Sequence, residues 1–101
     1  MKTVKVEYTV KESYVETNKA NIDAVMAELR KLGNVGVKYS VFLKEDGRTF
    51  IHMATTRDEL AEKVISSLES FKRFRKQLQA GAETKPAQQD LVLVNSSFDI
   101  A

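Results

Sequence analysis

The chain has 101 residues, of which 43% are hydrophobic and 30% charged, and its 16 Lys and Arg against 14 Asp and Glu give a formal net charge of +2. This length fits a single domain over residues 1–101, and the composition is that of a folded globular protein rather than a disordered or membrane chain. A net charge so near zero offers no strong attraction for nucleic acid or for an anionic membrane, so we expect neither as a partner.

Two residue counts limit the chemistry further. The chain has no cysteine, which excludes disulfides, thiolate nucleophiles and cysteine-bound zinc. Its only histidine is His52, and one imidazole without clustered carboxylates makes a poor transition-metal site.

The first ten residues alternate charged and apolar side chains, without the apolar run of a secretory leader or a membrane span. We therefore expect a cytoplasmic protein that uses no metal and no cofactor.

The first part of the chain predicts a strand followed by a helix. Apolar residues alternate with polar ones from Val4 to Val10, as in a strand with one buried face. From about residue 16 to residue 32 the apolar residues recur at helical spacing instead, and Gly33 is placed to end the helix in a left-handed conformation. The apolar residues of this helix are Ile22, Val25, Met26, Leu29 and Leu32.

A β-hairpin follows, with strands predicted at about 37–44 and 48–55 around a Glu45-Asp46-Gly47 turn. Apolar residues occupy both faces of this hairpin, so one layer of helices could not cover it.

The remaining part of the chain predicts a second helix and a last strand. Thr56 and Glu59 have the spacing of a capping box, and the apolar stripe that follows ends near Gly81, with the serines at 66–67 marking a break. A loop then leads to a strand predicted over residues 91–98. The order strand, helix, strand, strand, helix, strand is the ferredoxin-like βαββαβ pattern, an α+β fold with both helices on one face of an antiparallel sheet.

The hairpin turn decides which side chains share a face, and two registers are possible. With a tight turn at Asp46-Gly47, His52 lies opposite Val41 among apolar residues. With a left-handed bulge at Gly47, Val41 lies opposite Ile51 instead. We favour the bulge because it sorts apolar from polar residues better. The face it assigns to the helices comprises Val37, Tyr39, Val41, Leu43, Ile51 and Met53. The second face comprises Ser40, Phe42, Phe50, His52 and Ala54.

This second face is too apolar to remain in water. It holds Phe42 and Phe50, with Phe98 near them, and contiguous exposed apolar patches usually mark interaction sites. The same face of a second copy would cover all three aromatic side chains across a twofold axis, which is the commonest oligomer symmetry. We therefore expect a homodimer with Phe42, Phe50 and Phe98 at the interface.

The order of elements, the hairpin GVKYSVFLKEDGRTFIHMAT and the helical segment ESFKRFRKQLQAG resemble the dimeric α+β barrel proteins of the antibiotic-biosynthesis-monooxygenase-like superfamily. The resemblance implies a ferredoxin-like chain that dimerises into an α+β barrel, and an oxygenase that uses no metal or flavin and acts on a small aromatic molecule. Other members of the superfamily degrade haem, but this chain has no tryptophan and no clear counterpart of the asparagine, tryptophan and histidine set that those members use.

His52 is the strongest candidate for a catalytic residue, because an unperturbed pKa of ~6.5 suits proton transfer near neutral pH. Glu7, on the first strand, is its candidate catalytic partner across the sheet. The alternative is that Glu7 and His52 form a hydrogen bond or ion pair at the interface. In the favoured register Tyr39 faces the helices and His52 does not, so the two cannot line one pocket.

Two functions follow from these expectations. The first is a cofactor-independent oxygenase, and the second is a non-catalytic dimer that binds a small molecule or serves as an accessory protein. A nucleic-acid-binding module is the third and weakest alternative. Its only support is the run of aromatic and basic residues at 71–76, whose aromatic side chains face the core if the run is helical.

Overall fold

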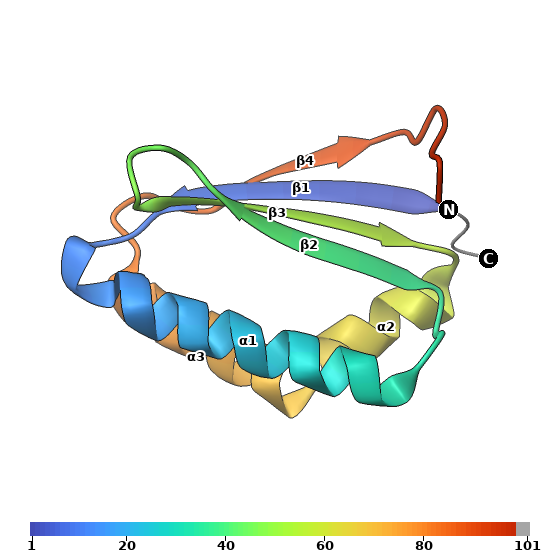
Figure 1. The fold of residues 1–101 in the computed structure, drawn as a ribbon, viewed down its shortest axis with the longest axis horizontal. Coiled ribbons are helices and arrows are strands. Elements are labelled where there is room, and N and C mark those ends of the chain that lie inside the picture. The colour runs from blue at the N-terminus through green and yellow to red at the C-terminus, as the bar shows by residue number, and fades with distance from the viewer. Residues whose placement is uncertain (99–101) are drawn as a thin grey trace.

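A computed structural model describes residues 1–98 and shows a four-stranded antiparallel sheet with its helices on one face (Figure 1). The strand order is β2-β3-β1-β4, which confirms the ferredoxin-like α+β fold. The elements in chain order are β1 (Lys2–Thr9), the 3-10 turn η1 (Glu12–Tyr14), α1 (Val15–Leu32), β2 (Val37–Leu43), β3 (Thr49–Thr56), α2 (Glu59–Ser67), α3 (Glu69–Gly81) and β4 (Ala87–Leu91).

The first strand and helix form where the sequence pattern predicts them. In β1 the alternate residues Val6 and Tyr8 lie toward the helices, and Tyr8 is buried in the core. Helix α1 ends at Gly33, whose φ of 72° is the left-handed conformation that glycine adopts without strain, and the Gly33 N–H donates to the Arg30 carbonyl.

The second helix begins later than the sequence predicts and is divided in two. Thr56 is the last residue of β3, and Asp58 is the N-cap of α2, where its carboxylate accepts a hydrogen bond from the Ala61 N–H at 2.9 Å. The proposed Thr56 capping box is therefore wrong. The predicted break at the paired serines is confirmed, since α2 ends at Ser67 and the extended backbone of Leu68 separates it from α3.

The last strand lies earlier than residues 91–98. Strand β4 spans Ala87–Leu91 and pairs antiparallel with β1, with Gln89 opposite Lys5. The prediction followed the apolar residues after Leu91, but β4 is an edge strand whose residues are all exposed, so its pairing does not depend on an apolar face.

The hairpin adopts the first of the two registers that the sequence allows, and not the favoured bulge register. Val41 lies opposite His52, and the Lys44 N–H donates to the Thr49 carbonyl beyond a four-residue loop. The carboxylate of Asp46 organises this loop by accepting hydrogen bonds from the backbone N–H groups of Arg48 and Thr49, each at 2.9 Å. The loop therefore shifts the pairing by one residue relative to the bulge, and every side chain of β3 moves to the opposite face.

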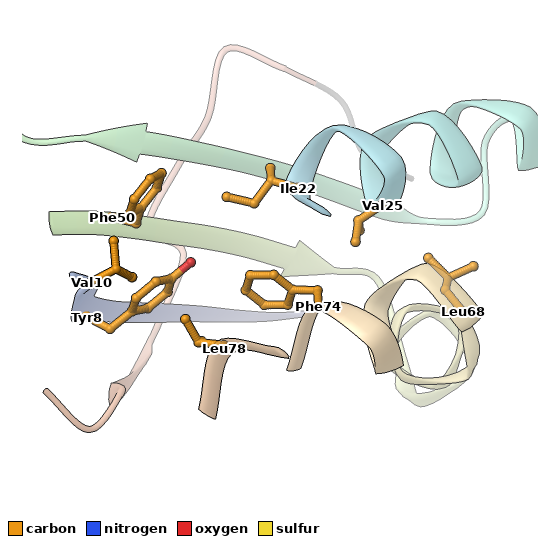
Figure 2. Close-up of a cluster of buried hydrophobic side chains, with 8 residues drawn as sticks. All are labelled: Tyr8, Val10, Ile22, Val25, Phe50, Leu68, Phe74 and Leu78. Carbon is orange, nitrogen blue, oxygen red and sulfur yellow. The ribbon is translucent and has the colours of Figure 1, made fainter. Parts of the chain in front are cut away.

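This register places Phe50 and His52 beneath the helices. Phe50 is 2% exposed and stacks on Tyr8 with their ring centroids 5.8 Å apart, so the prediction that Phe50 belongs to a subunit interface is wrong. Figure 2 shows aromatic and aliphatic side chains from the sheet and from α3 meeting between the two layers. The buried core consists of Tyr8, Val10, Ile22, Val25, Phe50, Leu68, Phe74 and Leu78.

The opposite face of the sheet has no helix over it within residues 1–98 (Figure 1). Phe42 lies on this open face and is 56% exposed, as the sequence pattern predicts for a residue available to a partner. Phe98 is 67% exposed, and the Lys38 ammonium lies 3.5 Å from the centre of its ring. Phe42, Met53, Leu93 and Phe98 line one hollow, so apolar side chains of β2, β3 and the segment after β4 meet on this face.

Candidate ligand site around His52

His52 is fixed between two tyrosine hydroxyls in the centre of the sheet. Its imidazole is buried, with Nε2 2.6 Å from the Tyr8 hydroxyl and Nδ1 2.7 Å from the Tyr39 hydroxyl. Strand β3 lies between β1 and β2, and the two tyrosines are diagonal neighbours of His52 on the same face, where long side chains can meet.

Helix α1 contributes a fourth member of this cluster. Asn18 is 0% exposed, and its Nδ2 donates to the Tyr8 hydroxyl at 2.9 Å. Its Oδ1 is buried without a hydrogen-bond partner among the described residues. Asn18, Tyr8, His52 and Tyr39 thus form one hydrogen-bonded chain from α1 across three strands.

The hydrogen bonds that link Asn18 to Tyr39 all run in one direction. The Tyr8 oxygen accepts from Asn18, and Nε2 of His52 is its only other described partner, so we assign the Tyr8 proton to the bond with Nε2. With this assignment, the one N–H of the neutral imidazole is on Nδ1 and donates to the Tyr39 oxygen. The Tyr39 O–H is left without a described partner and can donate to a ligand.

Burial determines the ionisation of these groups. It lowers the pKa of His52 from 6.5 to about 4, so the imidazole is neutral at pH 7. Burial also raises the pKa of the Tyr8 and Tyr39 hydroxyls above the usual value of 10.0, and the hydrogen bond from Asn18 opposes this rise at Tyr8. The cluster therefore offers polar but uncharged groups at neutral pH.

The cluster forms one wall of a cavity of about 490 Å³ between the sheet and α3. This volume lies within the range of about 300–1,000 Å³ that is usual for small-molecule sites. The Phe74 ring lies against the imidazole, with their centroids 5.3 Å apart. The other lining residues are Val6, Tyr8, Tyr39, Arg75, Leu78, Gln79, Ala82, Pro86 and Gln88.

The two residues proposed as catalytic partners do not meet. His52 lies beneath the helices, whereas Glu7 lies on the open face, where its carboxylate is 3.3 Å from the Lys44 ammonium and 3.6 Å from that of Lys5. The expected hydrogen bond or ion pair between Glu7 and His52 is therefore not formed. Tyr39, which the favoured register separated from His52, contacts it directly.

Sequence reasoning missed Tyr8 and Asn18 as members of the site. The alternation of Tyr8 with polar residues predicts a buried ring, and the ring is buried. The pattern gives no indication of what the Tyr8 hydroxyl contacts. Asn18 had a usable signal, because it precedes Ile22 by four residues and Val25 by seven and so lies on the apolar stripe of α1. A buried amide there requires a polar partner.

Residues 1–98 carry neither a clustered metal site nor a membrane-spanning helix. No group of three or more His, Asp or Glu side chains is placed there to hold a metal ion. No helix in that range is both long and apolar enough to cross a membrane.

The fold and the cavity together define a ferredoxin-like α+β protein with a ligand-sized space between its two layers. No family model and no curated protein matches the chain. Solved structures do match it. A crystal structure of an antibiotic biosynthesis monooxygenase superimposes with a TM-score of 0.79 at 14% sequence identity, covering 94% of this chain and 100% of that chain.

Two further structures agree with this result. A putative antibiotic biosynthesis monooxygenase from Nitrosomonas europaea has a TM-score of 0.81 at 10% identity, over 94% of this chain and 100% of that chain. A protein from Pseudomonas aeruginosa has a TM-score of 0.77 at 20% identity, over 93% and 94%. At these identities the likeness establishes the fold. The chain has the fold of the antibiotic-biosynthesis-monooxygenase-like proteins, as its sequence resemblance predicted.

Proposed function

We propose that the protein is a homodimeric α+β barrel protein that binds a small aromatic molecule in the cavity beside His52 and oxidises it with O₂, without a metal or flavin. The likeness to antibiotic biosynthesis monooxygenases supports the type of reaction. Because one fold hosts many activities, the choice of site rests on the cavity itself.

The observation that carries the proposal is the position of the Tyr8, His52 and Tyr39 cluster in the cavity wall. The cavity combines these convergent polar groups with apolar and aromatic surface from Phe74 and Leu78. A few placed polar groups in a mostly apolar hollow are typical of a site that orients a small molecule. A flat aromatic ring fits this surface. An oxygen on the ring can accept a hydrogen bond from the Tyr39 hydroxyl.

The proposed oxidation converts an activated CH₂ group of the substrate into a carbonyl. One atom of O₂ enters that carbonyl, and the other leaves as water with the two hydrogens of the CH₂ group, so the substrate supplies the electrons. With a pKa of about 4, His52 is a weak base at pH 7. Its role in this proposal is to hold Tyr39 in place, so that the Tyr39 hydroxyl stabilises the negative charge that develops on the substrate oxygen.

The dimer part of the proposal rests on the open face of the sheet. Phe42 is 56% exposed there, and Leu91, the last residue of β4, and Leu93 are 38% and 37% exposed. A second copy packed on this face would bury this apolar surface. The cavity lies on the other side of the sheet, so each subunit would keep its own site.

One observation favours a non-catalytic binding protein as the second candidate. Both ring nitrogens of His52 are already hydrogen-bonded to tyrosines, and no carboxylate lines the cavity within residues 1–98. In that case the cluster would orient a ligand without changing it.

The test measures O₂ uptake and binding on the same samples, using anthrone, a polycyclic ketone with a reactive CH₂ group. The proposal expects protein-dependent O₂ uptake above the spontaneous rate, matched by formation of the dione. Tyr39→Phe should lose this uptake, while Leu60→Ser, a change at a 73% exposed site on α2, should retain it. Binding without uptake would favour the second candidate, and absence of both would contradict the proposed aromatic site.

A further inference from the structure

We infer that the molecule bound in this cavity is an aromatic anion, such as an aromatic carboxylate, whose negative group is held by Arg75. This inference rests on the proposed aromatic site and specifies the class of its ligand. Its basis is the uneven charge of the lining together with the direction of the hydrogen bonds at Tyr39.

The lining of the cavity carries one positive charge and no negative one. Arg75 is the single charged residue among the described lining residues, and the other polar groups of α3 and β4 that reach the cavity are the neutral amides Gln79 and Gln88. The guanidinium carbon of Arg75 lies 5.9 Å from the centre of the Phe71 ring. No ion pair joins Arg75 to a described carboxylate. Arg48 pairs with Glu83 and Arg57 with Asp58, whereas Arg30 and Arg73, like Arg75, have no ion-pair partner among the described residues. What distinguishes Arg75 among the unpaired arginines is its place in the cavity lining.

An arginine of this kind can bind an anion that enters the cavity. Its planar guanidinium offers parallel N–H donors that match a carboxylate. Arg75 is an exposed residue of the cavity lining, whereas His52 is buried in the wall formed by the sheet. A neutral ligand would leave the charge of Arg75 unused, and a cationic ligand would be repelled by it.

The opposite wall offers a hydrogen-bond donor. The direction of the chain from Asn18 through His52 leaves the Tyr39 O–H as a free donor, so a second ligand oxygen that accepts a hydrogen bond fits there. Between the two ends the surface is apolar, from Phe74 and Leu78. The ligand class is therefore an aromatic ring system with an acidic group toward Arg75 and an acceptor oxygen toward Tyr39.

The experiment compares two probes that differ by one carboxylate, 6-hydroxy-2-naphthoate and 2-naphthol, by calorimetric titration of the full chain at pH 7. The carboxylate should bind about tenfold more tightly, which is the scale of one hydrogen-bonded charge pair. Arg75→Gln should remove this difference by weakening the binding of the carboxylate. Lys76→Gln is the matched control, because it makes the same change of charge at the next, exposed residue of α3, outside the cavity.

The possible outcomes separate this inference from the proposal it extends. If both probes bind equally and Arg75→Gln changes neither affinity, the cavity is an aromatic site without selection for anions, and the inference is wrong. If Lys76→Gln reduces the preference as much as Arg75→Gln does, the effect is that of net charge, which also contradicts a specific role for Arg75. If neither probe binds, the aromatic site itself is contradicted, and this inference is rejected with it.

Discussion

The Tyr8 hydroxyl lies 2.6 Å from Nε2 of His52, and both residues are almost completely buried, at 2% and 5% exposure. The only imidazole of the chain is thus part of the packed interior rather than a side chain projecting into solvent. This position decides both when His52 can take up a proton and how much its neighbours contribute to stability.

The first prediction concerns the titration of His52. Its pKa falls from 6.5 to about 4 because burial disfavours the charged imidazolium. The C2 proton of the imidazole, followed by NMR, should therefore shift with a midpoint near pH 4 in the folded protein. Because the chain has one histidine, no assignment is needed. A midpoint near 6.5 in the folded state would contradict the burial of the ring.

The same pKa difference makes stability depend on pH. Between pH 6.5 and pH 4 the unfolded chain binds a proton at His52 and the folded chain does not, so the free energy of unfolding should fall as the pH is lowered through this window. The total contribution is roughly 3 kcal/mol. Urea unfolding of wild type and His52→Gln at several pH values would isolate it, because the lowered pKa values of Asp46 and Asp58 affect both proteins alike.

Two matched substitutions should differ in their cost. Tyr8→Phe leaves the Asn18 Nδ2 and the His52 Nε2 without partners in a buried place, and it should lower the free energy of unfolding by about 2 kcal/mol. Tyr39→Phe should cost less, about 1 kcal/mol or below, because Tyr39 and His52 both line the open cavity, from which water can reach Nδ1 of His52. If Tyr8→Phe and Tyr39→Phe lowered the free energy of unfolding equally in thermal or urea unfolding, the hydrogen-bonded series that begins at Asn18 would not be maintained in solution.

Asn18 should determine which nitrogen of His52 carries the proton. In the wild type we expect the Nδ1–H form, since Tyr8 accepts from Asn18 and donates to Nε2. Asn18→Asp at pH 8 places an acceptor beside Tyr8, so the Tyr8 proton should turn to the carboxylate and the imidazole should change to the Nε2–H form. Two-bond ¹H–¹⁵N correlation spectra distinguish these forms.

The control for this experiment is Asn21→Asp, which makes the same change on the same helix. Asn21 bonds to Gln77 rather than to the cluster, so its substitution should leave the tautomer unaltered. The directional chain would be refuted by an Nε2–H form in the wild type.

The open sheet face predicts the effect of a charge on assembly. Phe42→Glu should convert the proposed dimer into a monomer, because the carboxylate would be buried without a partner at the interface. Light scattering at micromolar concentration would measure the mass. Leu60→Glu, at a 73% exposed position on α2, is the matched control and should remain dimeric. A monomeric wild type would contradict the dimer itself.

The element order could be predicted from the sequence because each main element has its own signal. The alternation in β1, the helical spacing before Gly33 and the break at Ser67 are local patterns, and the structure confirms all three. Strand β4 could not be found this way. Its residues are polar and exposed, and it is held by backbone pairing with β1, which leaves no mark in the hydrophobic pattern.

The candidate site was only partly predictable for a related reason. His52 was found because of its chemistry, but its neighbours depend on the pairing between strands. The bulge at Gly47 gave a tidier separation of apolar and polar residues than the register that forms. The loop geometry instead follows from the hydrogen bonds to Asp46, which sorting by hydrophobicity does not take into account. The result is that Tyr39 and His52 share a face.

The Asp46 loop, at the surface of the molecule, therefore determines which side chains of β3 line the candidate ligand site. A shift of one residue in the pairing of Lys44 with Thr49 would replace the imidazole beneath the helices with Ile51 or Met53, although the composition of the hairpin would be unchanged. Whether a related chain keeps this site can thus be judged from the length and acceptor of its hairpin loop before any binding residue is compared. Among such chains, a histidine at the same aligned position has no meaning for function unless the loop also agrees.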